Sequence, residues 1–349
     1  MSHWTQPSSA AAPAPASTRV GTLLTSRRLW LVLAAIAIGL LPMVFTDSYW
    51  RTNLIVCAIN VLLAVGLDFV LGYAGQLNLG QSAFYGIGAY ASTLLITRLG
   101  LPFWLAFLGG VLLAGLAGMV LSPFAVRLRG HYLAIASLGF AVITYQVLLN
   151  WISLTQGPLG IYGIAPPPPL RIPGLPAIEF GNLANMFYLT AGFALITYIV
   201  LDQLMRSPVG ETLTAIREDE VSAASLGIDC RKWKVFAFAV SSAVAGAAGC
   251  FYAAFVGTLV PDAFFITESF SILAMVIVGG MGTLIGPVLG AILLTVLPEL
   301  LRGIGDLRLL VYGLAVTLVV LFMPGGIVQA ARLAAARLRF PVIAARTEP

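Results

Sequence analysis

Charged side chains are scarce in this sequence, and Asp, Glu, Lys and Arg together account for 9% of its 349 residues. The two lysines, Lys232 and Lys234, do not follow a glycine-rich loop, so the phosphate-binding motif G-x-x-x-x-G-K-[ST] is absent. The two histidines, His3 and His131, exclude any familiar histidine-based zinc site. There is no nucleophile elbow. The sequence therefore offers no ATP-hydrolysing, metal or hydrolase site of a common kind.

Cysteine is also rare. The three cysteines, Cys57, Cys230 and Cys250, stand far apart and two lie inside apolar runs, which does not indicate a disulfide framework or a metal site. Apolar residues are abundant, at 59% of the chain, and mean hydropathy is +0.97. Apolar runs of about 17 to 22 residues recur, the length that crosses a bilayer as a helix. This pattern excludes a water-soluble domain of this size and predicts an all-α polytopic membrane protein.

We expect about ten transmembrane helices, at residues 29–45, 53–71, 82–98, 103–122, 131–152, 185–203, 235–259, 269–284, 286–302 and 308–323. Residues 1–28, rich in Ala, Pro, Ser and Thr, should be a disordered cytoplasmic tail. No A-x-A cleavage site follows the first run, so we favour a retained span over a signal peptide. Residues 29–325 would then form the membrane domain and 326–349 a basic cytoplasmic tail.

The distribution of positive charge predicts the orientation. With the N-terminus inside, fourteen of the nineteen Lys and Arg residues fall in cytoplasmic segments. The five in outer segments are Arg51, Arg98, Arg171, Arg302 and Arg308. An even number of spans keeps the C-terminal arginines inside, so both termini should be cytoplasmic. The net charge of +5 therefore reflects topology and does not indicate a nucleic-acid partner.

The densest group of charges lies in a predicted cytoplasmic loop, residues 205–234, which contains RSPVGETLTAIREDEVSAASLGID. Ser207 and Pro208 form an N-cap followed by proline at the first helical position, and Gly227 suits a left-handed C-cap. A small apolar strip remains: Leu213, Ile216, Ala223, Ala224 and Leu226. We expect one or two short exposed helices here. A polar helix between membrane spans needs a reason to be ordered, and we interpret it as a docking element for another protein.

Two glycine-rich segments interrupt the membrane pattern without a single charge: GYAGQLNLGQ at residues 72–81 and GGMGTLIGP at residues 279–287. We expect the first to dip into the bilayer or to join helix ends inside the protein, where non-helical backbone must be buried in protein or line a wet cavity. The alternative is a tight turn whose amides cap helix ends. The second is either part of a substrate pathway or a structural elbow. The candidate pathway residues are Gly75, Gln76, Asn78, Gln81, Gly279 and Gly280.

Three further features concern the architecture. The outer segment 153–184 contains four consecutive prolines, residues 166–169, and would cover the outer mouth, meet a periplasmic partner or serve as an ordered connector.

Small residues recur every four positions, which suits close helix packing: Gly110, Ala114 and Gly118, then Ser242, Gly246 and Cys250, and Ser241, Ala245 and Gly249. The sparse intramembrane charges Asp68, Glu268 and Glu299 lie near span ends, from where they can reach water, and Asp68 could instead cap the elbow at Gly72.

Three stretches together resemble the inner-membrane permeases of bacterial ABC importers for branched-chain amino acids, and among these the M-type permeases: GYAGQLNLGQSAFYGIGAYAS, RSPVGETLTAIREDEVSAASLGI and ILAMVIVGGMGTLIGPVLGA. The resemblance runs from about residue 50 to 325. The AIREDE stretch with its trailing LGI is the most specific part. The glycine-rich segments are shared with urea, amide and sugar permeases.

The resemblance implies a transport subunit that is not itself an enzyme and binds no cofactor. Its expected partners are an H-type permease chain, two cytoplasmic ATPases that use ATP and Mg, and a periplasmic binding protein, in the bacterial inner membrane. The loop would couple to the ATPases. The matching residues are Gly210, Leu213, Ala215, Ile216, Arg217, Glu218, Glu220, Ala224, Leu226 and Gly227. Leu213 and Ile216 would enter an apolar groove on the ATPase, and Arg217, Glu218 and Glu220 would pair at its rim.

ATP binding would then move the docked helices and alternate access across the membrane, while the binding protein supplies most of the selectivity. Within the same class, the alternatives are a permease for urea or short amides, or for aromatic acids. Outside it, a stand-alone secondary transporter would need buried coupling charges, which are scarce here. A passive channel with the loop as a regulatory dock is the third possibility.

Overall fold

The computed structural model describes residues 36, 38–127, 131–169, 179–305, 307–323 and 325–330. Residues up to Phe45 form a unit of their own, in which 38–44 are helical. The predicted N-terminal tail, residues 29–35 and 37 of the first predicted span, and the tail after residue 330 lie outside the described residues. The second unit begins at Thr46.

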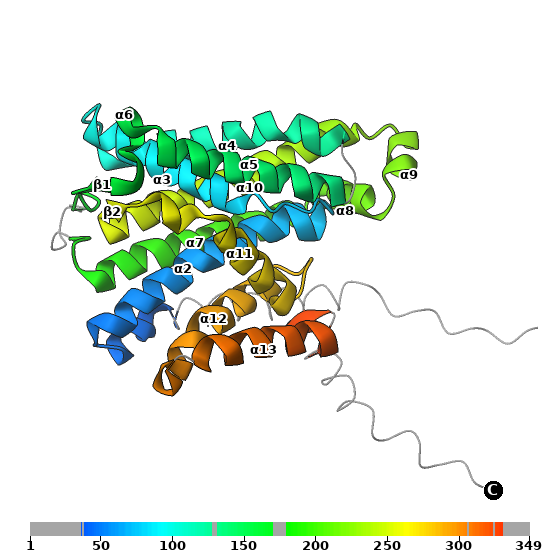
Figure 1. Ribbon diagram of the computed structural model, residues 1–349. Helices are drawn as coiled ribbons and strands as arrows, with labels where there is room; N and C mark the ends of the chain where they lie inside the picture. Colours follow the sequence, from blue (N-terminus) through cyan, green and yellow to red (C-terminus); the bar gives the residue numbers. More distant parts are fainter. Residues whose placement is uncertain are drawn as a thin grey trace, which may run out of the picture. The chain divides into compact units, whose positions relative to one another are not determined.

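This unit is built from helices (Figure 1). The longer ones are α2 Ser48–Asp68, α3 Gln81–Thr97, α4 Phe103–Arg127, α5 His131–Asn150, α7 Leu183–Met205, α8 Pro208–Glu218, α10 Cys230–Val256, α11 Ile266–Gly279, α12 Ile285–Leu300 and α13 Leu307–Phe322. The shorter elements are the π-helical turn Phe69–Tyr73, α6 Ile152–Thr155, α9 Glu220–Ser225 and the 3₁₀ turns Gly157–Leu159, Pro261–Phe264 and Leu301–Ile304. Two short strands, β1 Ile161–Tyr162 and β2 Thr258–Leu259, pair antiparallel with Ile161 opposite Leu259. The predicted all-α class is confirmed.

Within the described residues, seven helical segments are long and apolar enough to cross a membrane: Ser48–Tyr73, Phe103–Pro123, His131–Asn150, Leu183–Met205, Cys230–Val256, Pro261–Gly279 and Ile285–Gly303. Helices α3 and α13, with 17 and 16 residues, are shorter than these. The eighth and ninth predicted spans are confirmed as two separate helices, α11 and α12. The protein is therefore a multi-pass membrane protein. The number ten and the cytoplasmic location of both termini stay predictions.

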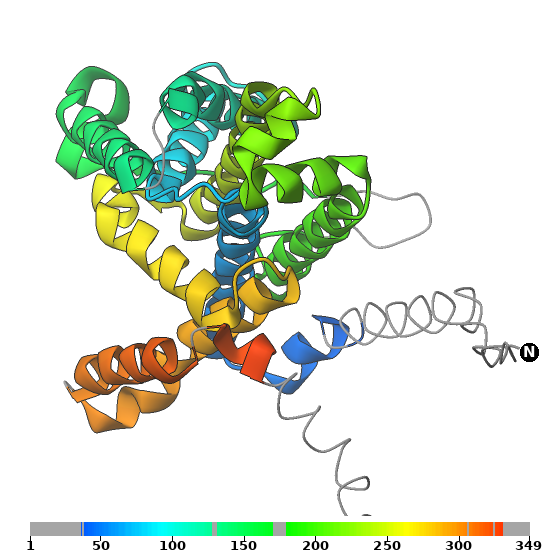
Figure 2. The ribbon, with the colours of Figure 1, turned by 90° about the vertical axis from the view of Figure 1, so that its right-hand side faces the viewer.

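The two polar regions predicted on opposite sides of the membrane lie at opposite ends of this helical unit. Figure 1 shows α8 and α9 at one end and α6, β1 and β2 at the other, and Figure 2 looks onto the α8–α9 end. Helix α10 connects the two ends, because it follows the α8–α9 loop and leads into β2. In the outer segment, residues 163–169, which include the proline run, contain no helix, as predicted.

Helix α10 packs between α4 and α3 through its small residues. A methyl group added to Gly118, Gly246 or Gly110 would lie within 3.0 Å of Ser242, Ala114 or Cys250 respectively, closer than real Cβ atoms approach. The face 110/114/118 therefore meets the face 242/246/250 residue by residue. On the α3 side, a methyl on Gly249 would meet the Tyr85 carbonyl. The predicted packing role of these small residues is confirmed.

Candidate functional site

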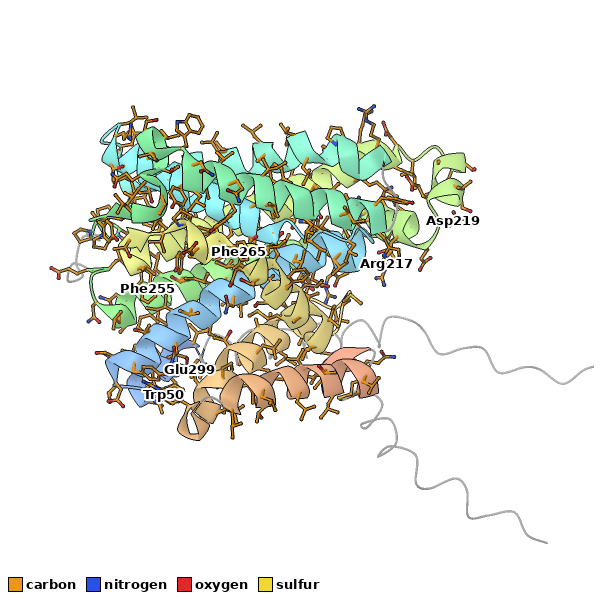
Figure 3. All side chains as sticks on the ribbon, viewed as in Figure 1. Trp50, Arg217, Asp219, Phe255, Phe265 and Glu299 are labelled. Atoms are coloured by element: carbon orange, nitrogen blue, oxygen red, sulfur yellow. The ribbon has the colours of Figure 1, made fainter. Side chains whose placement is uncertain are left out.

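The predicted loop between two spans folds into two short helices with the expected ends. Ser207 Oγ accepts a hydrogen bond from the Val209 amide at 3.3 Å and caps α8, and Gly227 has φ +85° after α9. Asp219 caps α9 and is exposed (Figure 3): its Oδ1 accepts from the Val221 amide at 2.9 Å and its Oδ2 from the Ser222 hydroxyl at 2.6 Å. These hydrogen bonds hold the pKa of Asp219 below its ordinary value.

Three of the five residues of the apolar strip of this loop are buried, namely Leu213, Ile216 and Ala223. Leu213 is fully buried and Ile216 is 4% exposed, and Ile216 packs with Ala223 and Cys230 in a small core. Ile228 and Trp233 cover this core. The prediction that Leu213 and Ile216 enter a groove on another protein is therefore wrong in its geometry. Their apolar surface is already buried against this chain, which is what an amphipathic helix achieves when it lies on a helical unit.

The other matched residues differ in exposure. Arg217, Glu218, Ala224, Leu226 and Gly227 are exposed, Ala215 and Glu220 are half-buried, and Gly210 is buried against the Met205 carbonyl. The exposed large apolar side chains of the loop are Leu226, 82% exposed, and Val221, 63% exposed. A shallow groove of mixed polarity lies beside them, lined by Glu220, Val221, Ala224, Ser225, Ile228, Asp229 and Cys230. We call this surface, the groove together with Leu226, the α9 surface.

An ion pair fastens α9 to α10. The Lys234 ammonium, largely buried, lies 2.7 Å from Glu220 Oε1, and the Cys230 thiol contacts the Glu220 carbonyl oxygen at 3.6 Å. Lys234 and Cys230 were not predicted as members of this site. Glu220 and Lys234 lie on different helices with a turn between them, so the i, i+3 and i, i+4 pairing rules within one helix could not have revealed the pair.

The first glycine-rich segment runs back into the helical unit. After the π-helical turn, the Gln81 amide nitrogen reaches the Leu63 carbonyl at 3.5 Å and its oxygen lies 3.4 Å from the Ser241 hydroxyl. Ser241 is about 16 Å along α10 from its first residue, at 1.5 Å per residue. Helix α3 therefore begins deep inside the protein, and the prediction that this segment dips inward is confirmed.

The amides of this segment do two different things. Asn78 Oδ1 accepts from the Gly80 amide at 2.8 Å and Asn78 Nδ2 donates to Gln81 Oε1 at 3.2 Å, so these two side chains hold the turn into α3. Gln76 is 4% exposed, and neither of its amide atoms has a hydrogen-bond partner among the described residues. Asn78 and Gln81 thus follow the alternative prediction of a tight turn held by its amides. The side-chain amide of Gln76 remains available to bind a ligand.

The second glycine-rich segment is the tip of a hairpin formed by α11 and α12. A methyl on Gly279 or Gly290 would clash with the backbone of the opposite helix, at Gly286 or Met275. Gly280 has φ +117° and Gly282 φ +74°, conformations that favour glycine. This packing accounts for Gly279 and Gly280 as an elbow. Their role in a substrate pathway stays a prediction.

The loop and both glycine-rich segments meet at one place. The Arg217 guanidinium donates through Nη1 to the Gly72 carbonyl, and Asp68 Oδ1 accepts from the Gly282 amide at 2.8 Å. Asp68 is fully buried, so it does not reach water, and its carboxylate lies beside Gly72, as the alternative prediction has it. Glu299 is half-buried and accepts a hydrogen bond from Tyr49, so its access to water stays a prediction.

These features define a multi-pass helical membrane protein with an ordered polar loop at one end and two embedded glycine-rich segments. Comparison with known families matches residues 51–323 to the family described as branched-chain amino acid transport system / permease component. The chain is 37% identical over 297 residues to the high-affinity branched-chain amino acid transport system permease protein LivM of Escherichia coli K12, covering 78% of this chain and 68% of that protein.

It is 26% identical to the corresponding permease protein LivH of Salmonella typhimurium, over 76% of this chain and 90% of that protein. It is also 26% identical to the ribose import permease protein RbsC of Haemophilus influenzae, over 79% of this chain and 85% of that protein. No solved structure gives a significant match. The chain belongs to the family of permease components of branched-chain amino acid transport systems.

Proposed function

We propose that this chain is the translocation subunit of an ATP-driven ABC importer for branched-chain amino acids in the bacterial inner membrane. Its family membership and its likeness to LivM support the substrate class. The observation that carries the coupling role is the α9 surface, which presents Val221 and Leu226 on an ordered polar loop at one end of the helices. Exposed apolar side chains on such a loop suit burial by a protein partner.

The proposed assembly contains an H-type permease chain, two cytoplasmic ATPases and a periplasmic binding protein. ATP and Mg would act at the ATPases. The exposed Asp229 belongs to the α9 surface, and the exposed Glu218 and Asp219 directly precede α9. We propose that these carboxylates form ion pairs with an ATPase. Because exposed ion pairs contribute about 0–1 kcal/mol each, such pairs would determine the register of docking more than its affinity.

For the substrate pathway, we propose the embedded segment at Gly75 and Gln76. A zwitterion needs donors and acceptors in the same place, and a primary amide offers both. The buried Gln76 amide, with no partner among the described residues, supports this assignment. Most of the selectivity would come from the binding protein.

Co-purification tests the coupling role. The tagged full chain is extracted in mild detergent, and wild type is compared with the double variant Val221→Asp/Leu226→Asp. We expect wild type to retain ATPase subunits and the variant to lose them. The control is Leu159→Asp, because Leu159 is 75% exposed at the opposite end of the helices. Ile216→Asp is unsuitable, since it would place a charge in the core of the loop.

The proposal fails if wild type retains no ATPase under any nucleotide condition. Uptake of labelled leucine, urea and phenylalanine into vesicles that contain the purified complex tests the substrate. ATP-dependent uptake of leucine is expected. Preferred uptake of urea or of phenylalanine would indicate a permease for urea or short amides, or for aromatic acids, respectively. Uptake by the isolated chain without ATP would favour a secondary transporter or a channel.

A further inference from the structure

Arg217 and Asp68 join three segments that are far apart in the sequence. Arg217 belongs to the last turn of α8, and it donates to the Gly72 carbonyl in the π-helical turn after α2. Asp68 lies one turn before Gly72, and it accepts from the Gly282 amide at the tip of the α11–α12 hairpin at 2.8 Å. The loop thus contacts the first glycine-rich segment directly and the second through Asp68.

The glycines make this close approach possible. A methyl on Gly75 would lie 2.9 Å from Arg217 Cγ, and one on Gly282 would lie 2.9 Å from Arg217 Nη1 and 3.3 Å from the Gly72 oxygen. A methyl on Gly72 would clash with the Asp68 carboxylate. Larger residues would separate the Arg217 guanidinium from both glycine-rich segments. The glycines are therefore needed for this contact as well as for the turns.

The charges also fit. The chain leaves the helix at Ala74, so the Gly72 carbonyl lies at a helix C-terminus, where acceptors lack intrahelical donors and a cation is favourable. The buried Asp68 carboxylate lies one turn before the Gly72 carbonyl that the Arg217 guanidinium binds. Asp68 Oδ2 has no hydrogen-bond partner among the described residues, and so offers the guanidinium a second acceptor near Gly72.

We propose that Arg217 and Asp68 are positioning residues that lock α8 to both embedded segments, and that movement of α8 reaches the membrane interior through this lock. The proposal rests on the proposed coupling function. When α8 shifts, the guanidinium either carries the Gly72 carbonyl with it or moves toward Asp68 Oδ2. Both changes alter the turn that leads into the Gly75–Gln81 segment and the contact that holds the Gly282 tip.

The test measures leucine uptake per ATP hydrolysed, in vesicles that contain the purified complex with its ATPases and binding protein. The variants are Arg217→Ala, Arg217→Lys and Asp68→Asn. The asparagine keeps the acceptor for the Gly282 amide but removes the charge. Arg231→Ala is the matched control, because Arg231 is an exposed arginine at the start of α10. Each variant must first retain its ATPases, which separates coupling from folding and docking.

For Arg217→Ala we expect about tenfold less uptake per ATP, with hydrolysis retained, as for a coupling free energy of ordinary size. Arg217→Lys should recover part of the uptake, because it keeps the charge but not the fork of donors. The double variant Arg217→Ala/Asp68→Asn should be no worse than Arg217→Ala, since both act on one element.

Unchanged uptake per ATP in Arg217→Ala would overturn the proposal. So would a loss of uptake per ATP in the double variant that equals the product of the losses in the two single variants. If the wild-type complex shows no ATP-dependent leucine uptake, the proposed function fails instead. The two failures are therefore distinguishable.

Discussion

The Lys234 ammonium lies 2.7 Å from the Glu220 carboxylate and holds α9 against the start of α10. The Lys234 side chain is 9% exposed, whereas the Glu220 side chain is 27% exposed. A second pair in the same loop, Lys232 with Asp229 at 3.0 Å, is far more exposed. The two pairs should therefore differ strongly in their effect on the loop.

Glu220→Gln should loosen α9, because it leaves a buried ammonium without its carboxylate. Breaking a buried pair costs about 3–5 kcal/mol, and partial exposure of Glu220 reduces this to about 1–3 kcal/mol. The measurement is the rate at which maleimide labels Cys230, which is 8% exposed, with the site located by mass spectrometry. We expect the rate to rise about 5–150-fold. Lys232→Gln should leave it unchanged, and equal rates in both variants would contradict the prediction.

The cap at Asp219 should make α9 sensitive to acid. The pKa of Asp219 is lowered by hydrogen bonds from Ser222 and Val221, so its stabilising effect is present above the unfolded value of about 3.9 and is lost as pH falls through the lower folded pKa. Hydrogen-exchange protection at Val221 should be constant from about pH 5 to 8 and fall in acid.

Two variants check the cause of that acid sensitivity. Asp219→Asn should keep most of the protection, because an asparagine oxygen also caps, and should remove the acid step. Asp219→Ala should lower protection at every pH. An acid step that persists in Asp219→Asn would show that another group is responsible.

Gly246→Ala should destabilise the protein, although alanine is the better helix former. The added methyl would meet Ala114 across the α4–α10 contact, and overpacking costs about 1–3 kcal/mol. Gly192→Ala in α7 is the matched control, since nothing lies within 4 Å of its added methyl. We expect a lower thermal unfolding temperature in detergent for the first variant and an unchanged or higher one for the second. Equal shifts would argue against close packing of these helices.

Ser269→Ala should destabilise the start of α3. Ser269 Oγ accepts from the Ser82 amide at 2.9 Å and lies 2.8 Å from the Ser82 hydroxyl, both buried. A buried amide left without its acceptor costs about 1–3 kcal/mol. Ser271→Ala removes a hydroxyl that bonds the Thr267 carbonyl of its own helix at 3.1 Å, and should have little effect on unfolding temperature. If the two variants unfold alike, the Ser82–Ser269 contact does not support α3.

The sequence predicted features that depend on local chemistry or on helical period. Ser207 and Gly227 end their helices as capping rules require, and both occur beside the residues they serve. The apolar runs, the four-residue spacing of small side chains and the charge-free glycine segments are also patterns along one stretch of chain. They predicted an all-α membrane protein, small helix faces suited to close packing and the inward course of the segment before α3.

Only the tertiary structure decided how these pieces meet. Arg217 bonds Gly72 across 145 positions, and Asp68 bonds Gly282 across 214. No period in the sequence encodes such separations, because they depend on which helices pack side by side. For the same reason, the amphipathic pattern predicts that Leu213 and Ile216 are buried, but it does not predict which surface covers them. The tertiary structure shows that other parts of this chain cover them.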